Sequence, residues 1–142
     1  MTVSIHPEPF DPLALLAAHQ RQLPPGRHGA QALFIGTLSD FNEGDPVQAM
    51  TLEHYPGMTE RELERIEQEV RDRWPVLEVL VAHRVGHIDP GEPIVLTAAW
   101  SAHRAAAFDA CRFLMETLKS RAPFWKRERL TDGRQRWVQG NT

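Results

Sequence analysis

Two apolar runs, V76-L-E-V-L-V-A-H-R-V85 and P93-I-V-L-T-A-A-W100, indicate the centre of the fold. Both are rich in aliphatic and β-branched residues, which favour strands. The segment between them, G86-H-I-D-P-G-E92, is rich in Gly, Pro and Asp, and we interpret it as a turn-rich connection. We therefore expect the two runs to form a hairpin-like pair of strands.

Further strand-like segments flank this pair on both sides. In chain order they are residues 3–5, 30–38, 47–55, 124–130 and 134–138. Residues 30–38 are apolar, and we interpret them as a buried strand, followed by a loop over S39-D-F-N-E-G-D-P46. The last two segments are joined by T131-D-G133, which is typical of a hairpin turn.

Three segments carry the signals of helices. The first begins after Asp11, the expected N-cap, with Pro12 at the first helical position. In the second, Thr59 as N-cap and Glu62 three residues later predict a capping box, and the helix ends at W74-P75.

The third helix is expected from an N-cap at Ser101 to about residue 120. Hairpin-like pairs of strands interrupted by about three helices predict an α+β fold with a mixed, largely antiparallel sheet. The length, 142 residues, predicts a single domain over residues 1–142.

The composition argues against several classes of protein. An apolar share of 42% and a charged share of 25% are ordinary for a globular protein. The sequence contains no run of about 18 apolar residues, so it predicts no membrane-spanning helix. The first residues, MTVSIHPE, lack the basic and apolar regions of a signal peptide, so we expect a cytoplasmic protein. The lone Cys111 lies among apolar residues, and we interpret it as a small core residue rather than a nucleophile.

The distribution of cations is uneven. The chain has fourteen Arg but only two Lys, Lys119 and Lys126, and both lie in K119-S-R-A-P-F-W-K126. Lysine can lose its proton and act as a base or nucleophile, whereas arginine cannot; the alternative is drift under a coding bias. Residues 1–100 contain seven Arg and fifteen Asp or Glu, whereas residues 101–142 contain nine Lys or Arg and four Asp or Glu. This basic C-terminal third suggests an anionic ligand.

The expected third helix carries candidate residues at both ends. S101-A-H103-R104 lies at its start, where free N–H groups and Arg104 could bind an anion, although a solvated surface is the alternative. Met115 and Lys119 share a face near its end, and in the strand expected over residues 124–130 Lys126 and Glu128 would point to the same side. Because Lys119 is fifteen positions after Arg104, an unbroken helix places them about 22 Å apart. One small ligand could contact both only if two copies of the chain form a homodimer with a shared site.

Other kinds of site are less favoured. His83 and His87 have a spacing that can suit a metal but no clear third ligand, so we expect no metal site. Aromatic residues near the basic stretch could stack on bases, yet the stretch is short and the rest of the chain is acidic, so we do not expect nucleic-acid binding. No P-loop or dinucleotide motif is present, and we expect no cofactor.

Three blocks, T51-L-E-H-Y-P-G-M-T-E60, S101-A-H-R104 and L118-K-S-R-A-P-F-W-K-R-E128, resemble the large, catalytic subunit of molybdopterin synthases. The resemblance spans roughly residues 3–138 and implies an α/β-hammerhead-type α+β fold. It also implies a central homodimer that becomes a heterotetramer when a small ubiquitin-like sulfur-carrier subunit binds at each outer end. The C-terminal Gly-Gly thiocarboxylate of that partner would deliver sulfur to cyclic pyranopterin monophosphate, which gives molybdopterin.

The resemblance also implies roles for individual residues. Lys119 and Lys126 would be catalytic and would also bind substrate, and His103 and Arg104 would bind substrate from the neighbouring subunit. The remaining expected substrate-binding residues are Phe34, Thr37, Leu38, Ser39, Met115, Arg127 and Glu128.

The expected substrate loop departs from the family pattern. The family loop usually runs Lys-Val-Arg-Asn-His-Asn, whereas here it is T37-L-S-D-F-N42, with Ser39 in place of the arginine. The alternative hypothesis is therefore a paralogue that docks the partner but has weak or no catalysis.

Overall fold

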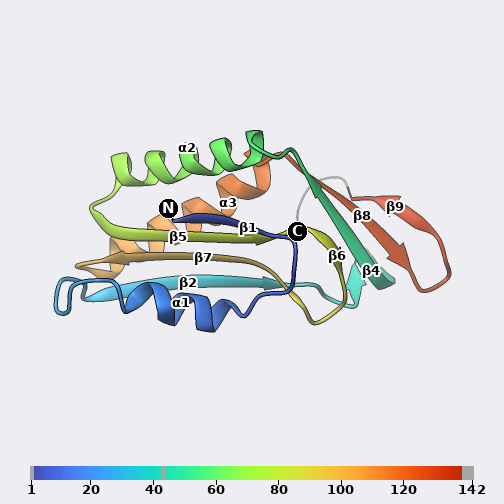
Figure 1. Ribbon diagram of the computed structural model, residues 1–142, viewed down its shortest axis with the longest axis horizontal. Coiled ribbons are helices and arrows are strands. Elements are labelled where there is room, and N and C mark those ends of the chain that lie inside the picture. The colour runs from blue at the N-terminus through green and yellow to red at the C-terminus, as the bar shows by residue number, and fades with distance from the viewer. Residues whose placement is uncertain (1, 43, 139–142) are drawn as a thin grey trace.

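The computed structural model describes residues 2–42 and 44–138 (Figure 1). In chain order its elements are β1 (Val3–His6), α1 (Pro12–Gln20), β2 (Ala30–Thr37), β3 (Phe41–Asn42), β4 (Asp45–His54), α2 (Met58–Arg73), β5 (Val76–Arg84), β6 (Gly86–Ile88), β7 (Pro93–Ser101), α3 (Arg104–Arg121), β8 (Phe124–Leu130) and β9 (Gln135–Trp137). The predicted α+β class, with three helices and mostly antiparallel pairing, is confirmed.

The first sheet has the strand order β1-β5-β7-β2. The central strands β5 and β7 are antiparallel, as their sequences predict, and only β1 pairs in parallel, with β5. The prediction that residues 30–38 form a buried strand is wrong for most of its length. β2 lies at the edge of this sheet, and Leu33 and Phe34 are 40% and 41% exposed. An apolar run predicts a strand, but it does not show whether other strands or helices of the same chain cover that strand.

The helices cover both faces of the first sheet (Figure 1). On one face, buried residues of α2 and α3, such as Leu63 and Leu114, pack against Val79 and Ala99 of the central strands. On the other face, α1 contributes Leu16 to a smaller core around Trp100. Among the described residues, no helix is both long and apolar enough to cross a membrane.

The second sheet has the order β3-β4-β8-β9, with β6 also paired to β4. Two predicted connections are therefore partly wrong. Residues 86–92 contain the short strand β6, and the predicted loop 39–46 contains β3 and the start of β4; Glu43 of that loop lies outside the described residues. The predicted β8–β9 hairpin is confirmed, and Gly133 has the positive φ of 91° that its turn requires.

The start of α1 is as predicted. The Asp11 carboxylate accepts hydrogen bonds from the N–H groups of Leu13 (3.0 Å) and Ala14 (3.2 Å), and Pro12 is the first helical residue. The first helical turn thus receives partners for two N–H groups that have no acceptor within the helix.

The N-cap of α2 lies two residues before the predicted one, and the N-cap of α3 lies two residues after the predicted one. Gly57, not Thr59, caps α2, and its N–H donates to Glu60 (3.0 Å). The buried Thr59 hydroxyl instead donates to the Pro123 carbonyl (3.2 Å), which ties α2 to the segment before β8. Likewise Ser101 ends β7, and His103 is the N-cap of α3.

Candidate functional site

The helix α3 places the candidate residues at two separate ends of the molecule. It is unbroken over 18 residues, so Arg104 in its first turn and Lys119 in its last turn are about 22 Å apart. Its C-terminal end leads through two residues into β8, which carries Lys126. The two lysines therefore belong to one region, whereas Arg104 belongs to another.

A cavity of about 540 Å³ lies between α3 and the edge strand β2, and we call it the α3–β2 cavity. Three of the expected site residues line it: Phe34, Met115 and Lys119. The other apolar lining residues include the exposed Phe108 and the buried Cys111, and the other polar ones are Gln31, Arg112 and Glu116. Lys119 is thus one of two cations in a lining that is more apolar than polar.

A second cavity, of about 250 Å³, lies over β8, and we call it the β8 cavity. It is lined by the expected site residues Thr37, Leu38, Ser39, Lys126 and Glu128, together with neighbours that include Asn42 and Val138. Lys126 and Glu128 lie on the same side of β8, as their spacing predicts. The structure therefore separates the expected site residues into two cavities.

The charges of the two lysines nevertheless influence each other. Burial lowers the pKa of Lys126 below its ordinary value, and the positive charge of Lys119 lowers it further. The Glu128 carboxylate acts in the opposite direction but does not cancel the effect. The ammonium of Lys126 therefore gives up its proton more easily than that of a solvated lysine.

Arg127 lies on the opposite side of β8 from Lys126. Its guanidinium is 5.7 Å from the ring centre of Trp137, and it lines a separate cavity of about 160 Å³ with His87 and Gln135. Adjacent residues of a strand point to opposite faces, so Arg127 does not join Lys126 in the β8 cavity.

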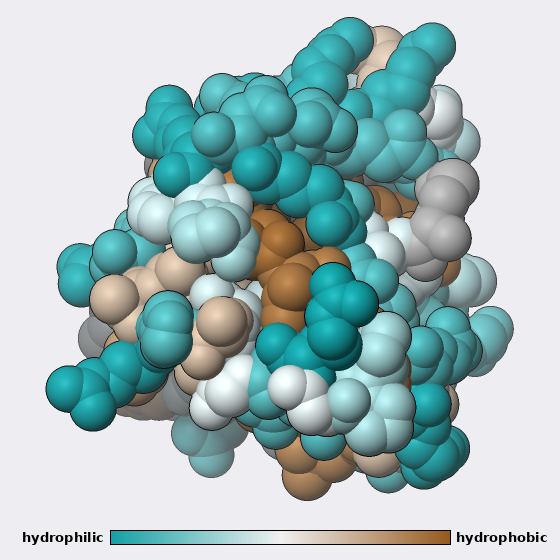
Figure 2. Space-filling model, turned by 90° about the vertical axis from the view of Figure 1, so that its left-hand side faces the viewer, coloured by the Kyte–Doolittle hydropathy of each residue, from teal (hydrophilic) through white to brown (hydrophobic). Residues whose placement is uncertain are grey.

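His103 and Arg104 are exposed at the end of the molecule where α3 begins. Figure 2 shows this end, on which hydrophilic residues surround a small hydrophobic area. Neither residue lines the α3–β2 cavity or the β8 cavity of the same chain. The structure does not bring them to the lysines within one copy.

Comparison with known proteins identifies the family. The family model described as "MoaE protein" matches residues 5–121. The chain belongs to the MoaE protein family. It is 48% identical to the molybdopterin synthase catalytic subunit of Pseudomonas aeruginosa, over 99% of this chain and 91% of that protein. It is 52% identical to the subunit of the same name from Escherichia coli, over 78% of this chain and 73% of that protein.

A solved structure supports the same conclusion. The molybdopterin biosynthesis MoaE protein from Burkholderia ambifaria superposes with a TM-score of 0.81 and 44% identity, over 99% of this chain and 90% of that one. The MoaE fold therefore extends beyond the segment that the family model matches.

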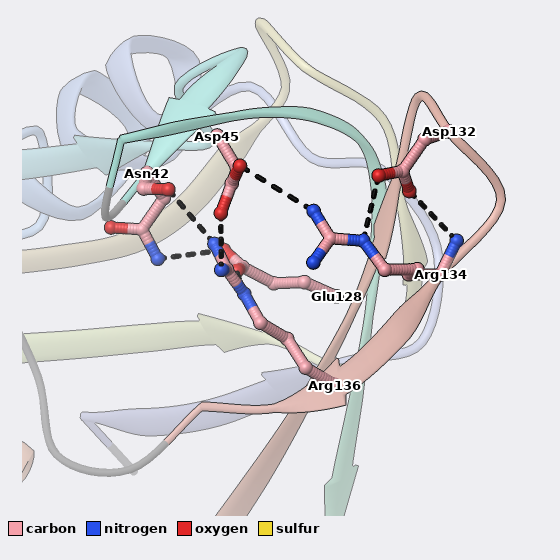
Figure 3. Close-up of polar contacts among 6 residues, drawn as sticks. All are labelled: Asn42, Asp45, Glu128, Asp132, Arg134 and Arg136. Atoms are coloured by element: carbon pink, nitrogen blue, oxygen red, sulfur yellow. Dashed lines mark hydrogen bonds and ion pairs between the residues drawn. The ribbon is translucent and has the colours of Figure 1, made fainter.

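Two residues beside the site of this MoaE family member were not expected from its sequence. The carboxylate of Glu128, which is 3% exposed, accepts hydrogen bonds from Arg136 Nε (3.0 Å) and Asn42 Nδ2 (2.9 Å) (Figure 3). The hairpin register could have indicated Arg136, because it lies opposite Glu128 across the T131-D-G133 turn. No local signal indicates Asn42, which lies 86 residues away from Glu128 in the chain.

His83 of this MoaE family member is a buried, uncharged residue. Its ring stacks on that of Phe124, with 4.0 Å between the ring centres. Its Nδ1 lies 2.8 Å from the Arg84 carbonyl oxygen, and because a carbonyl can only accept, Nδ1 is the protonated nitrogen and donates this hydrogen bond. Burial lowers the pKa of His83 to about 4. His87 is exposed and contacts Asp89, and among residues 2–42 and 44–138 no group of three or more His, Cys, Asp or Glu could hold a metal.

Cys111 is buried, as its apolar neighbours in sequence predict. Burial raises the pKa of its thiol, and the thiol donates to the carbonyl of Thr97 at 3.7 Å. A buried thiol with a raised pKa is a poor nucleophile. Its place beside the α3–β2 cavity therefore reflects packing.

Proposed function

We propose that this chain is the catalytic subunit of a molybdopterin synthase, which transfers sulfur to cyclic pyranopterin monophosphate to form molybdopterin. The observation that carries the proposal is that the only two lysines of the chain lie in one region, with Lys119 in the last turn of α3 and Lys126 on β8, which is separated from that helix by two residues. Two relatives that are 48% and 52% identical bear the name of this subunit.

The two lysines suit complementary tasks in sulfur transfer. The substrate carries an anionic phosphate, and attack by a sulfur atom builds up charge that a nearby cation stabilises. Lys119 supplies such a cation at the α3–β2 cavity. Lys126, with its lowered pKa, is the better proton carrier, because a base is most effective when its pKa lies close to the working pH.

The sulfur donor in this proposal is the C-terminal Gly-Gly thiocarboxylate of a small ubiquitin-like subunit. Two chains form a central homodimer within a heterotetramer, in which His103 and Arg104 of one copy complete the site that contains Lys119 of the other. The unbroken α3 supports this arrangement, because it keeps Arg104 and Lys119 about 22 Å apart within one copy. We further propose that residues 1–142 act as one domain and that the protein works in the cytoplasm.

Reconstitution tests the proposal. The purified chain, a thiocarboxylated small subunit and cyclic pyranopterin monophosphate are expected to give molybdopterin, measured by chromatography of its fluorescent oxidation product. Lys119→Ala is expected to abolish product while the homodimer stays intact by light scattering. Arg61→Ala, which removes an exposed cation from α2, serves as the control with unchanged activity. Unfolding of the Lys119→Ala variant would instead make Lys119 a structural residue.

A second candidate function is a docking paralogue with little catalysis, and the chemistry at Ser39 motivates it. The Ser39 hydroxyl donates to the Phe41 carbonyl (3.1 Å) and accepts from the Phe41 N–H (3.3 Å), so this residue closes a local turn and supplies no cation. For a working synthase, we expect Ser39→Arg to change product formation by less than about threefold, because Lys126 already provides a cation in the same cavity. A rise of about tenfold or more would favour the paralogue.

A further inference from the structure

We propose that Arg136 is a positioning residue, which holds the β3–β4 hairpin against β8 and so maintains the wall of the β8 cavity. The effect of Arg136 on the reaction rests on the proposed function, whereas its link between the hairpin and β8 does not. Arg136 lies on β9 and does not line the β8 cavity itself, so it acts through the residues that do.

The contacts of Arg136 reach three strands. Nε donates to Glu128 of β8 (3.0 Å), Nη1 donates to Asp45 at the start of β4 (3.0 Å), and Nη2 donates to the backbone carbonyl of Asn42 in β3 (2.8 Å). Figure 3 shows the guanidinium between these groups. A planar guanidinium can serve three acceptors at fixed angles, whereas an ammonium group cannot reproduce this geometry.

The buried carboxylate of Glu128 explains why the contact is strong. Glu128 is 3% exposed, and a buried carboxylate is costly unless charged or polar donors replace its water. Arg136 supplies the charged donor, and the Asn42 side chain supplies the second at 2.9 Å. The same carboxylate therefore joins β8 to both β3 and β9.

This arrangement controls one wall of the β8 cavity. Ser39, Phe41 and Asn42 form that wall, and Lys126 and Glu128 lie on the strand beneath it. The hairpin is closed at its base by the hydrogen bond from the Val47 N–H to the Asp40 carbonyl (2.8 Å), and the Thr131 N–H, just after β8, donates to the Pro46 carbonyl of β4 (3.3 Å). Without Arg136, the wall would lose a charged link to β8, whereas Lys126 would keep the backbone pairing between β4 and β8.

Arg134 provides a matched control. It lies two residues earlier on the same hairpin, carries the same charge and contacts Asp132 (2.6 Å) and Asp45 (3.5 Å), but not Glu128. Its side chain is 64% exposed, against 24% for Arg136. Arg134→Gln therefore removes one positive charge from this hairpin without removing the link to Glu128.

The experiment compares the wild-type chain with Arg136→Gln, Arg136→Lys and Arg134→Gln in the reconstituted enzyme. We expect Arg136→Gln to raise the KM for cyclic pyranopterin monophosphate about tenfold and to lower kcat by less than about threefold, because the wall is released while Lys126 stays in place. Arg136→Lys is expected to give an intermediate KM, and Arg134→Gln a KM equal to that of the wild type. In parallel, we measure hydrogen–deuterium exchange of the amides in residues 39–42 and 45–47. We expect this exchange to be faster than in the wild type for Arg136→Gln but unchanged for Arg134→Gln.

The possible outcomes separate the parts of the inference. Unchanged exchange in Arg136→Gln would overturn the link itself, and faster exchange with an unchanged KM would make Arg136 merely structural. If Arg136→Gln does not fold, a wild-type KM in folded Arg136→Lys would overturn the positioning role. Absence of product from the wild-type chain would refute the proposed function, while the exchange measurement, which needs no substrate, would still test the link.

Discussion

Subunit complementation should reveal whether the site is shared between two copies of the chain. α3 is a single helix from Arg104 to Arg121, and at 1.5 Å per residue it holds Arg104 about 22 Å from Lys119. A pterin phosphate cannot contact both residues in one copy, so Arg104→Ala and Lys119→Ala should each inactivate a homodimer. In a mixed dimer of the two variants, one of the two sites combines intact Arg104 with intact Lys119.

The expected magnitude follows from random pairing. Half of the dimers in an equal mixture are mixed, and one of the two sites in each is intact, so activity should return to about a quarter of the wild-type value. Product formation is measured after subunit exchange, and native mass spectrometry of differently tagged chains shows that mixed dimers have formed. Each variant exchanged with itself provides the baseline.

In a second mixture, a shared site lowers the activity instead of restoring it. When wild-type chains are mixed equally with Arg104→Ala/Lys119→Ala chains, a shared site loses one member in every mixed dimer, so about a quarter of sites remain active. A site contained in one chain would leave about half of the sites active. No recovery in the first mixture and half activity in the second, with exchange demonstrated, would refute the shared site.

Two further predictions concern individual side chains. Lys126→Arg keeps the cation but removes the group that can release a proton, so kcat should fall roughly 100-fold while KM changes little, measured by steady-state kinetics; an unaffected kcat would exclude a proton-carrying role. For His83, the unfolded chain takes up a proton near pH 6.5 and the folded chain only near pH 4, so its contribution to stability is present above pH 6.5 and is lost as the pH falls towards 4. We expect the difference in unfolding free energy between wild type and His83→Gln to shrink by about 3 kcal/mol over this interval, measured by urea denaturation, and a constant difference would contradict this assignment.

Local signals in the sequence were sufficient for much of the fold. The apolar runs that became β5 and β7, the Asp11–Pro12 start of α1 and the T131-D-G133 hairpin all depend on neighbours within a few residues. The resemblance carried by residues 51–60, 101–104 and 118–128 was likewise enough for the family, which the family match over residues 5–121 and the relative that is 48% identical over 99% of the chain confirm. The pairing of Lys126 with Glu128 on one side of β8 followed from strand periodicity alone.

Contacts between distant segments decided the remainder. The helix α2 begins at Met58 with Gly57 as its N-cap, and the Thr59 hydroxyl instead accepts from the Tyr55 N–H and donates to the carbonyl of the distant Pro123. β2 is an exposed edge of its sheet although its sequence is apolar.

What the sequence by itself determined is the identity of the elements, the family and the two lysines as candidates for catalysis. Only the tertiary structure decided that the lysines belong to two neighbouring cavities, that burial and mutual repulsion lower the pKa of Lys126, and that Arg136 and Asn42 hold Glu128. The physical reason is that propensity and periodicity act over a few residues, whereas burial and charge depend on all the atoms that folding brings together.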